Sequence, residues 1–326
     1  MFTDSSDCRI RQSTELMNYL AQTLEFQEIT INEKNRFSLC GGEAPFADLC
    51  FSQLWAWLGY FHYRFKYLGD IIAVVGITDE NDPGCIFIAK EYKADNIKLA
   101  VDYLSPAFER FGYPLEVHYI PDEILKHFQS LDEYDVSVSF DRSQSDYIYL
   151  TDEFLSLSGR ENKGKRNELR VFRERNTGCT FKNYTDELYD DLLTVFDGWC
   201  ETHSCDQCFY GCEKKAFERM MAVYDENFLC SLVYINDIPV SFGLAEKINK
   251  SFTVFHMQKN SVRLSGLTFY LHYMMAQYHK DTPYVNWGED MGIQGIRENK
   301  LKYRPVEIKP KFSIILKRKG SLNVTD

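Results

Sequence analysis

The order of strands and helices expected in the second half of the chain constrains the fold most. Two strand-forming runs, Phe228–Ile235 and Ile238–Lys247, are joined by the tight-turn dipeptide Asn236-Asp237. A third strand is expected at 251–258, and from there helices at 267–279 and 293–302 alternate with short strands at 284–288 and 311–317. A hairpin followed by alternating strands and helices predicts a mixed α/β sheet covered by helices.

The first half predicts a looser version of the same order. Its expected helices lie at 13–25, 95–111 and 122–131, and over 47–67 a buried helix is expected to run into a strand. Further strands are expected at 70–77, 85–90, 115–120, 134–140 and 146–150. The chain has 326 residues, and roughly 100–200 residues make one domain, so we expect two. Strands clustered in this way are typical of N-acetyltransferase-like (GNAT) domains. We therefore expect an N-terminal GNAT-like domain over 1–150, a basic linker helix over 151–180 and a C-terminal GNAT-like domain over 181–326.

Charge and motif content exclude several classes of function. The chain has 37 Lys and Arg against 48 Asp and Glu, a net charge of −11, which disfavours a protein that depends mainly on sequence-independent nucleic-acid binding. It has no Walker motif, no nucleophile elbow and no HExxH, so P-loop, serine-hydrolase and zinc-protease mechanisms are disfavoured. Neither a signal peptide nor a run of about 18 apolar residues is recognised, so we expect a cytoplasmic protein, with the membrane surface as a second location.

The marked basic run of the chain lies at 159–175, GRENKGKRNELRVFRER. From Lys165 onward it predicts a helix, with Lys163, Arg166 and Asn167 near its start. The free N–H groups and positive end of a helix suit phosphates, so this start is a candidate anion site. The alternative is a solvated helix held by i, i+4 ion pairs, such as Arg170 with Glu174.

A second candidate site is the strand-to-helix turn at 263–267. Arg263, Ser265 and Gly266 precede an expected helix, an arrangement in which backbone N–H groups can hold phosphate. Acetyltransferases show Q/R-x-x-G-x-G/A here, whereas the last position of this chain is Thr268. The alternative is an ordinary turn.

Two carboxylates, Glu289 and Asp290, follow the strand expected at 284–288. The carboxyl end of a strand is the usual ligand position in α/β folds, and a carboxylate there could accept a proton from an attacking amine or hydroxyl. Lys300 and Tyr303 are expected on one face of the next helix. The alternative for Asp290 is a helix cap.

A cysteine cluster, Cys200, Cys205, Cys208 and Cys212, surrounds His203. The spacing leaves three alternatives open: a compressed zinc site, reactive thiols, or ordinary reduced thiols in a chain that has no secretory signal. Ordinary thiols are favoured, and no metal is expected.

Three stretches of the chain resemble an uncharacterised bacterial family that is related to the C-terminal catalytic domain of phosphatidylglycerol lysyltransferase and to Fem-type peptidyltransferases. The stretches are 145–169, 254–273 and 286–305, and the resemblance spans about 45–317. The matching residues are Tyr147, Ile148, Tyr149, Gly159, Lys165, Arg166, Asn167, His256, Lys259, Asn286, Glu289, Asp290, Gly292, Gly295, Ile296 and Arg297, continued by Lys300 and Tyr303. The chain departs from the family at Gln258, where the family usually has an acid.

The resemblance implies two tandem GNAT-like domains and an acyl- or aminoacyltransferase. The donor would be acyl-CoA or an aminoacyl-tRNA, whose acceptor end would contact the chain, and the acceptor a small molecule or a lipid headgroup. No tightly bound cofactor is expected.

Roles for the candidate residues follow from this hypothesis. Glu289 would be the general base or the carboxylate that binds an amino group, Tyr303 a proton donor to the leaving group, and His256 a further residue of the catalytic cleft. Binding roles fall to Lys163, Lys165, Arg166, Asn167, Lys259, Arg263, Ser265, Gly266, Asp290 and Lys300. A second hypothesis is a non-catalytic GNAT-like module that binds an anionic metabolite or headgroup, motivated by Gln258 and Thr268.

Overall fold

The computed structural model describes residues 5–40, 46–77, 82–202 and 212–320. The chain divides into two compact units, one made of residues 1–145 and 310–326 and the other of residues 146–309. Over the described residues, each unit contains a seven-stranded mixed sheet. None of the described helices is both long enough and apolar enough to cross a bilayer.

The first sheet has the strand order β1-β2-β3-β4-β5-β14-β6. Its strands are β1 (Gln27–Glu28), β2 (Arg64–Leu68), β3 (Ile71–Ile77), β4 (Pro83–Ile88), β5 (Leu115–Ile120), β14 (Phe312–Arg318) and β6 (Tyr134–Phe140). The helices of this unit are α1 (Ser5–Gln22), α2 (Lys34–Cys40), α3 (Phe51–Phe61), α4 (Ala94–Arg110) and α5 (Leu125–Gln129). Helix α4 buries Ile97, Leu104 and Phe108, whose helical spacing places them on one face against the sheet.

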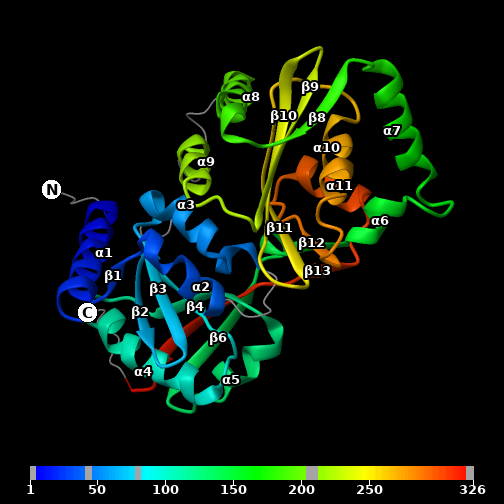
Figure 1. Cartoon of the computed structure of the whole chain (residues 1–326). Helices are drawn as coiled ribbons and strands as arrows, with labels where there is room; N and C mark the ends of the chain where they lie inside the picture. The colour runs from blue at the N-terminus through cyan, green and yellow to red at the C-terminus, as the bar shows by residue number, and fades with distance from the viewer. Residues whose placement is uncertain (1–4, 41–45, 78–81, 203–211, 321–326) are drawn as a thin grey trace. The chain divides into compact units, whose positions relative to one another are not determined.

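The second sheet has the order β13-β7-β12-β11-β10-β9-β8. Its strands are β13 (Glu307–Lys309), β7 (Asp146–Leu150), β12 (Tyr284–Asn286), β11 (Phe252–Asn260), β10 (Ile238–Lys247), β9 (Phe228–Ile235) and β8 (Cys179–Asn183). The helices are α6 (Thr151–Ser156), α7 (Lys163–Arg175), α8 (Tyr189–Thr202), α9 (Glu213–Met221), α10 (Leu267–Ala276) and α11 (Gln294–Lys302). Figure 1 shows α8 and α9 on one face of strands β9 to β11, and α7 and α10 on the other.

The predicted tight turn between β9 and β10 is confirmed. Asn236 and Asp237 both adopt positive φ, 50° and 64°, and Ile235 pairs with Ile238. Two successive positive φ values define the type I′ turn, whose twist matches that of antiparallel strands.

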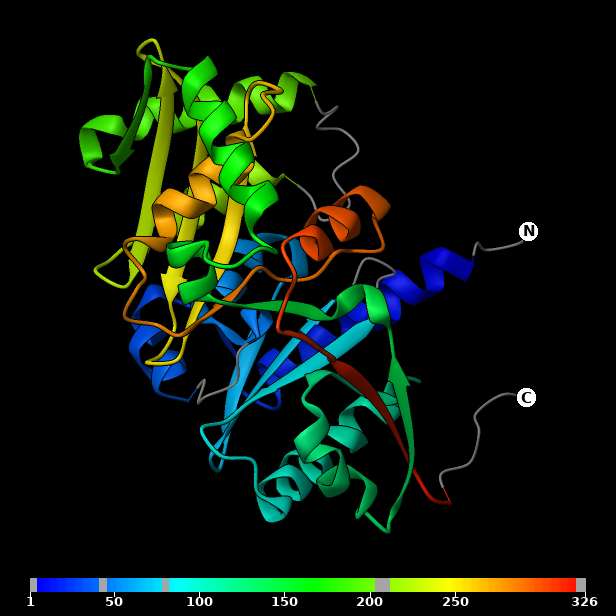
Figure 2. The ribbon, with the colours of Figure 1, turned by 90° about the vertical axis from the view of Figure 1, so that its right-hand side faces the viewer.

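The units differ from the expected domains at two strands, which are exchanged. Strand β14, near the C-terminus, lies between β5 and β6 of the first sheet, as Figure 2 shows in dark red. Strand β7, expected to end the first domain, lies between β12 and β13 of the second. Ile314 and Leu316 of β14 are buried in the core of the first unit, so the final strand belongs to that unit.

Helix α7 also differs from its expected place as a linker. Leu169 and Phe172 are buried in the core of the second unit, and Phe172 packs on Tyr270 of α10 with ring centroids 4.9 Å apart. The basic run therefore forms one side of the second domain.

Parallel pairing in the second sheet stops early. Strands β11 and β12 pair at Phe252 with Tyr284, at Thr253 with Val285 and at Val254 with Asn286. Strand β12 ends at Asn286, whereas β11 continues to Asn260. The segment after Asn286 therefore leaves the sheet beside the continuing strand, and this segment carries the predicted carboxylates.

Candidate functional site

The loop after β12 is built around Asn286, which is fully buried. Its side-chain oxygen accepts a hydrogen bond from the N–H of Gly288 at 2.6 Å, and its Nδ2 donates to Oδ2 of Asp146 at 2.7 Å. Gly288 has a φ of 65°, a conformation that glycine adopts without strain. Asn286 thus turns the chain sharply at the end of the strand and ties the turn to β7.

Lys300 holds the same loop from the following helix. Its ammonium donates to the backbone oxygens of Trp287 at 2.5 Å, Gly288 at 3.0 Å and Glu289 at 2.6 Å. An ammonium has three protons, and three carbonyls in succession receive them here. In this geometry Lys300 holds the loop, and its predicted contact with substrate stays a prediction.

Asp290 organises the next part of the loop. It is fully buried, and its two oxygens accept two hydrogen bonds from Arg297, each of 2.9 Å. Oδ2 also accepts from the hydroxyl of Tyr147 at 2.6 Å, and Oδ1 from the N–H of Gly292 at 2.9 Å. Helix α11 begins after Ile293 and has no side-chain cap, so Asp290 is not the helix cap of the sequence alternative; its side chain holds the loop instead.

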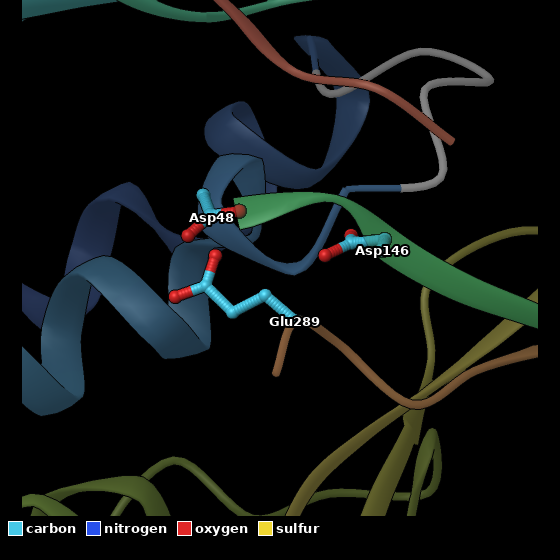
Figure 3. A group of neighbouring side chains, drawn as sticks. All are labelled: Asp48, Asp146 and Glu289. Carbon is cyan, nitrogen blue, oxygen red and sulfur yellow. The ribbon is translucent and has the colours of Figure 1, made fainter. Parts of the chain in front are cut away.

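Glu289 lies between these two anchors, with its backbone held by Lys300 and its neighbour held by Arg297. Figure 3 shows its side chain extending from the loop, and Asp146 on β7. A carboxylate oxygen of Glu289 lies within 4.8 Å of one of Asp146. Asp146 is fully buried, while Glu289 is half-buried. A carboxylate on a rigid loop, partly open to solvent and beside a second carboxylate, has the placement that proton transfer requires.

Lys165 lies in an aromatic enclosure instead of at an anion site. Its Nζ is buried, lies 3.0 Å from the centroid of the Tyr303 ring and 4.8 Å from that of Phe269, and has no hydrogen-bond partner among the described residues. Burial lowers the pKa of Lys165 to about 7. Trp287, two residues before Glu289, contacts Tyr303 with ring centroids 5.0 Å apart. Lys165 thus packs among the aromatic rings that contact Trp287. Its ammonium is directed at those rings and not at a site for donor phosphates.

Tyr303 and His272 complete this enclosure. Tyr303 is buried, and burial raises the pKa of its phenol, so it stays protonated near neutral pH. Burial and the nearby ammonium groups of Lys165 and Lys300 lower the pKa of His272 to about 3, so its ring is neutral.

The remaining residues near the start of α7 have mixed surroundings. Arg166 donates through Nη1 to the backbone oxygens of Leu157 at 2.5 Å and Gly159 at 2.8 Å. Asn167 accepts a hydrogen bond from Arg170, and Lys163 is exposed. The predicted ion pair of Arg170 with Glu174 is present at 2.6 Å, as the solvated-helix alternative requires.

The predicted phosphate turn before α10 is covered by α7. Gly266 has a φ of 87°, and a Cβ added there would lie 3.1 Å from the Cβ of Phe172 and 3.5 Å from the backbone oxygen of Glu168. Arg263 and Ser265 are exposed. Because a helix packs directly on the glycine, the turn lacks the open space that a pyrophosphate would need.

The two departures from the expected patterns, Gln258 and Thr268, form one contact. Nε2 of Gln258 donates to Oγ1 of Thr268 at 3.1 Å, and Nδ2 of Asn260 donates to the same oxygen at 3.0 Å. The end of β11 and the start of α10 are thereby joined by side chains.

His256 and Lys259 are directed away from this group of residues. Phe255 contacts His272 and Trp287, whereas the neighbouring His256 contacts Glu246 through Nε2 at 2.8 Å. Lys259 lies 3.6 Å from the centroid of the Trp199 ring on α8 and forms an ion pair with Glu213 on α9. Successive residues of a strand face opposite sides of the sheet, and the register shift of β10 against β11 falls at His256, so His256 and Lys259, three residues apart, can share a face. The expectation that these two residues share a cleft with Glu289 is therefore not met.

The zinc alternative depends mostly on residues that lie outside the described part of the chain. His203, Cys205 and Cys208 are among them. Cys200 lies in the last turn of α8, and Cys212 is exposed immediately before α9.

Sequence reasoning did not assign site roles to Asp146, Tyr147 and Arg297. Both Tyr147 and Arg297 belong to the matched stretches. Arg297 lies seven residues after Asp290 and Tyr147 lies 143 residues before it, and neither separation gave a reason to pair them with Asp290. Asp146 had one usable signal, because a charged residue directly before a buried Tyr-Ile-Tyr strand requires a partner.

Comparisons with known proteins extend these observations. Residues 45–315 match the family described as phosphatidylglycerol lysyltransferase, C-terminal. No curated protein matches the chain. A protein of unknown function from Bacteroides thetaiotaomicron VPI-5482 is 22% identical with a TM-score of 0.79, and the match covers 90% of this chain and 99% of that one.

Two further solved structures share the fold. L-PGS from Bacillus licheniformis is 16% identical with a TM-score of 0.64, and the match covers 91% of this chain and 94% of that one. FemX is 12% identical with a TM-score of 0.61, and the match covers 87% of this chain and 96% of that one. The expected fold class, mixed α/β with two tandem acetyltransferase-like domains, is confirmed.

Proposed function

The chain belongs to the phosphatidylglycerol lysyltransferase C-terminal family, and from this premise we propose that it is an aminoacyltransferase. The donor is an aminoacyl-tRNA. The acceptor is an amine or a hydroxyl of a small molecule or a lipid headgroup. L-PGS and FemX, which share the fold, support transfer as the general class of reaction.

The reaction is a direct displacement on an ester. The acceptor nitrogen or oxygen attacks the aminoacyl carbonyl carbon and forms a new bond, and the ester C–O bond to the terminal ribose breaks. The acceptor loses one proton, and the released ribose hydroxyl gains one, so no oxidant, metal or covalent enzyme intermediate is needed. We assign the removal of the acceptor proton to Glu289.

The observation that carries this assignment is the double anchoring of the Glu289 loop. Lys300 binds the backbone oxygen of Glu289, and Arg297 binds the carboxylate of Asp290. A general base must be held within hydrogen-bond reach of the proton that it removes, and rigid support of this kind is what such a group requires. His256 and Lys259 have no part in the proposal, because they face the other side of the sheet.

The packing of α7 supports an aminoacyl-tRNA over acyl-CoA as donor. Acyl-CoA enzymes of this fold hold pyrophosphate at the turn before the helix that corresponds to α10. Phe172 and Glu168 of α7 cover Gly266 at that turn. An aminoacyl ester presents no pyrophosphate and does not require the turn to be open.

The contact between Gln258 and Thr268 weakens the alternative of a binding module that has lost transfer. Those two departures motivated the alternative, and their side chains are hydrogen-bonded to each other. The two residues therefore form one side-chain contact between β11 and α10, and their identities do not indicate a phosphate site that has lost its function.

The test is a donor and acceptor panel with the purified chain. It uses tRNA charged with a labelled amino-acid mixture in one arm and labelled acetyl-CoA in the other. Each donor is offered with aminosugars, peptides and dispersed phospholipids as acceptors. The proposal predicts labelled product from charged tRNA and none from acetyl-CoA. Product from acetyl-CoA alone would contradict it.

A further inference from the structure

A groove between α6, α7 and α10 lies apart from the Glu289 loop. It has a volume of about 390 Å³, within the range of small-molecule sites. Three guanidinium groups line it, those of Arg166, Arg170 and Arg173, spaced four and three residues apart and therefore on one face of α7. No residue of the proposed transfer site is among its lining residues.

The groove keeps an excess of positive charge. Its one lining carboxylate is that of Glu174, which pairs with Arg170 at 2.6 Å. Three guanidinium groups against one carboxylate leave a net charge of +2 in a chain whose overall charge is −11. Such a local reversal of sign attracts an anion.

Arg173 is the guanidinium best placed to bind that anion. Its Cζ lies 5.7 Å from the centroid of the Tyr270 ring and 5.5 Å from that of Tyr273, and Nη2 lies 4.0 Å from the sulfur of Met274. Among the described residues, no carboxylate lies within ion-pair distance of Arg173. The rings orient the guanidinium while its charge stays uncompensated.

Part of the groove lining is aliphatic, from both α7 and the segment at α6. Leu155, Leu157 and Leu169 form this part, and Leu157 and Leu169 are buried. A ligand that is only an anion would make no contact with this aliphatic part of the lining. We propose that the groove binds an anionic amphiphile, with its phosphate or carboxylate head on Arg173 and Arg170 and its alkyl chain along the three leucines.

The test titrates the full chain with octyl phosphate below its micelle concentration, and with inorganic phosphate and octanol as the two halves of that probe. The proposal predicts that octyl phosphate binds at least about tenfold more tightly than either half, because both the anion and buried methylene groups contribute. Equal affinity for octyl phosphate and inorganic phosphate, or for octyl phosphate and octanol, would overturn it.

Matched variants locate the site. Arg173→Gln should weaken octyl phosphate binding about five- to tenfold, whereas Arg175→Gln, which removes the same charge from the exposed end of the same helix, should change it less than twofold. Glu174→Gln should tighten binding, because it releases Arg170. Equal effects of the Arg173 and Arg175 variants would show attraction by net charge alone and would overturn the proposal.

Vesicles then distinguish the source of the amphiphile. Cosedimentation with phosphatidylcholine vesicles that contain phosphatidic acid, lost in Arg173→Gln and kept in Arg175→Gln, would identify a bilayer lipid. Octyl phosphate binding without cosedimentation would identify a soluble amphiphile such as a fatty acid. Both results agree with the proposed groove. Because aminoacyl transfer is measured separately, failure of this test leaves the proposed function unaffected.

Discussion

The ammonium of Lys300 donates a hydrogen bond to the backbone oxygen of Glu289 at 2.6 Å. This contact joins α11 to the loop that leaves the sheet after β12. Lys300, which the sequence predicted to bind substrate, therefore also holds the backbone of the candidate base.

Replacing Lys300 by Met should lower transfer activity strongly and stability moderately. The variant leaves the backbone oxygens of Trp287, Gly288 and Glu289 without their shared donor, at a cost of about 2–3 kcal/mol. Unfolding in urea and steady-state kinetics measure the two effects. Lys302→Met is the matched control, because Lys302 is exposed and pairs with Glu168 at the surface, and it should change both little. Equal loss of activity in the two variants would contradict the positioning role.

The pair of Asp290 and Arg297 should behave as one unit. Asp290→Ala and Arg297→Met should each destabilise the fold, the former by about 3 kcal/mol, because removal of one partner leaves the other uncompensated. The double variant should lose clearly less than the sum of the two, since both changes remove the same contact. A double-mutant cycle by urea unfolding measures this. Additive losses would show that the two side chains act independently.

Two glycine substitutions should have opposite signs. In Gly266→Ala the new Cβ meets Phe172 at 3.1 Å in a backbone with φ of 87°, so we expect a loss of about 1–3 kcal/mol. Gly295 lies in α11 with no neighbouring atom within 4 Å of an added Cβ, so Gly295→Ala should stabilise by about 0.5–1 kcal/mol. Thermal unfolding compares them. Stabilisation by Gly266→Ala would show that α7 does not pack on this turn.

Lys165 should make stability depend on pH in the alkaline range. Its pKa is about 7 in the folded chain, below the ordinary value of 10.5, because burial disfavours the charge. Between these values the unfolded chain binds more protons than the folded one, so the free energy of unfolding rises with pH. The free energy of unfolding of wild type minus that of Lys165→Met should therefore become more positive from pH 7 to pH 10. Urea unfolding at steps of half a pH unit measures it. A constant difference would contradict the assigned shift.

Local patterns predicted most elements of the fold but not which strands pair. The Asn236-Asp237 turn and the apolar face of α4 depend on neighbouring residues, and both were predictable. The pairing of β14 with β5 joins segments almost 200 residues apart, and Ile314 and Leu316 would satisfy either sheet, because alternation specifies a face and not a partner.

In the candidate site, too, positions along the chain were predictable and contacts between distant segments were not. Glu289 and Asp290 could be located from their position after a strand, but neither reading of Asp290 foresaw its contacts with Tyr147 and Arg297. The direction of each side chain could not be predicted. His256 faces away from Phe255 because adjacent strand residues alternate, and Lys165 turns into the ring of Tyr303, which lies on a segment more than 130 residues later.

The most direct test of the account is the single-turnover rate of Glu289→Gln with charged tRNA and the acceptor that the panel identifies. The account predicts a rate at least about 100-fold below wild type with an unchanged unfolding midpoint, because Gln keeps the shape of the side chain but cannot accept the proton. Glu298→Gln, a change of the same kind on the exposed face of α11, should remain within about twofold of wild type. A Glu289→Gln rate within threefold of wild type would contradict the role of Glu289 and with it the proposed mechanism.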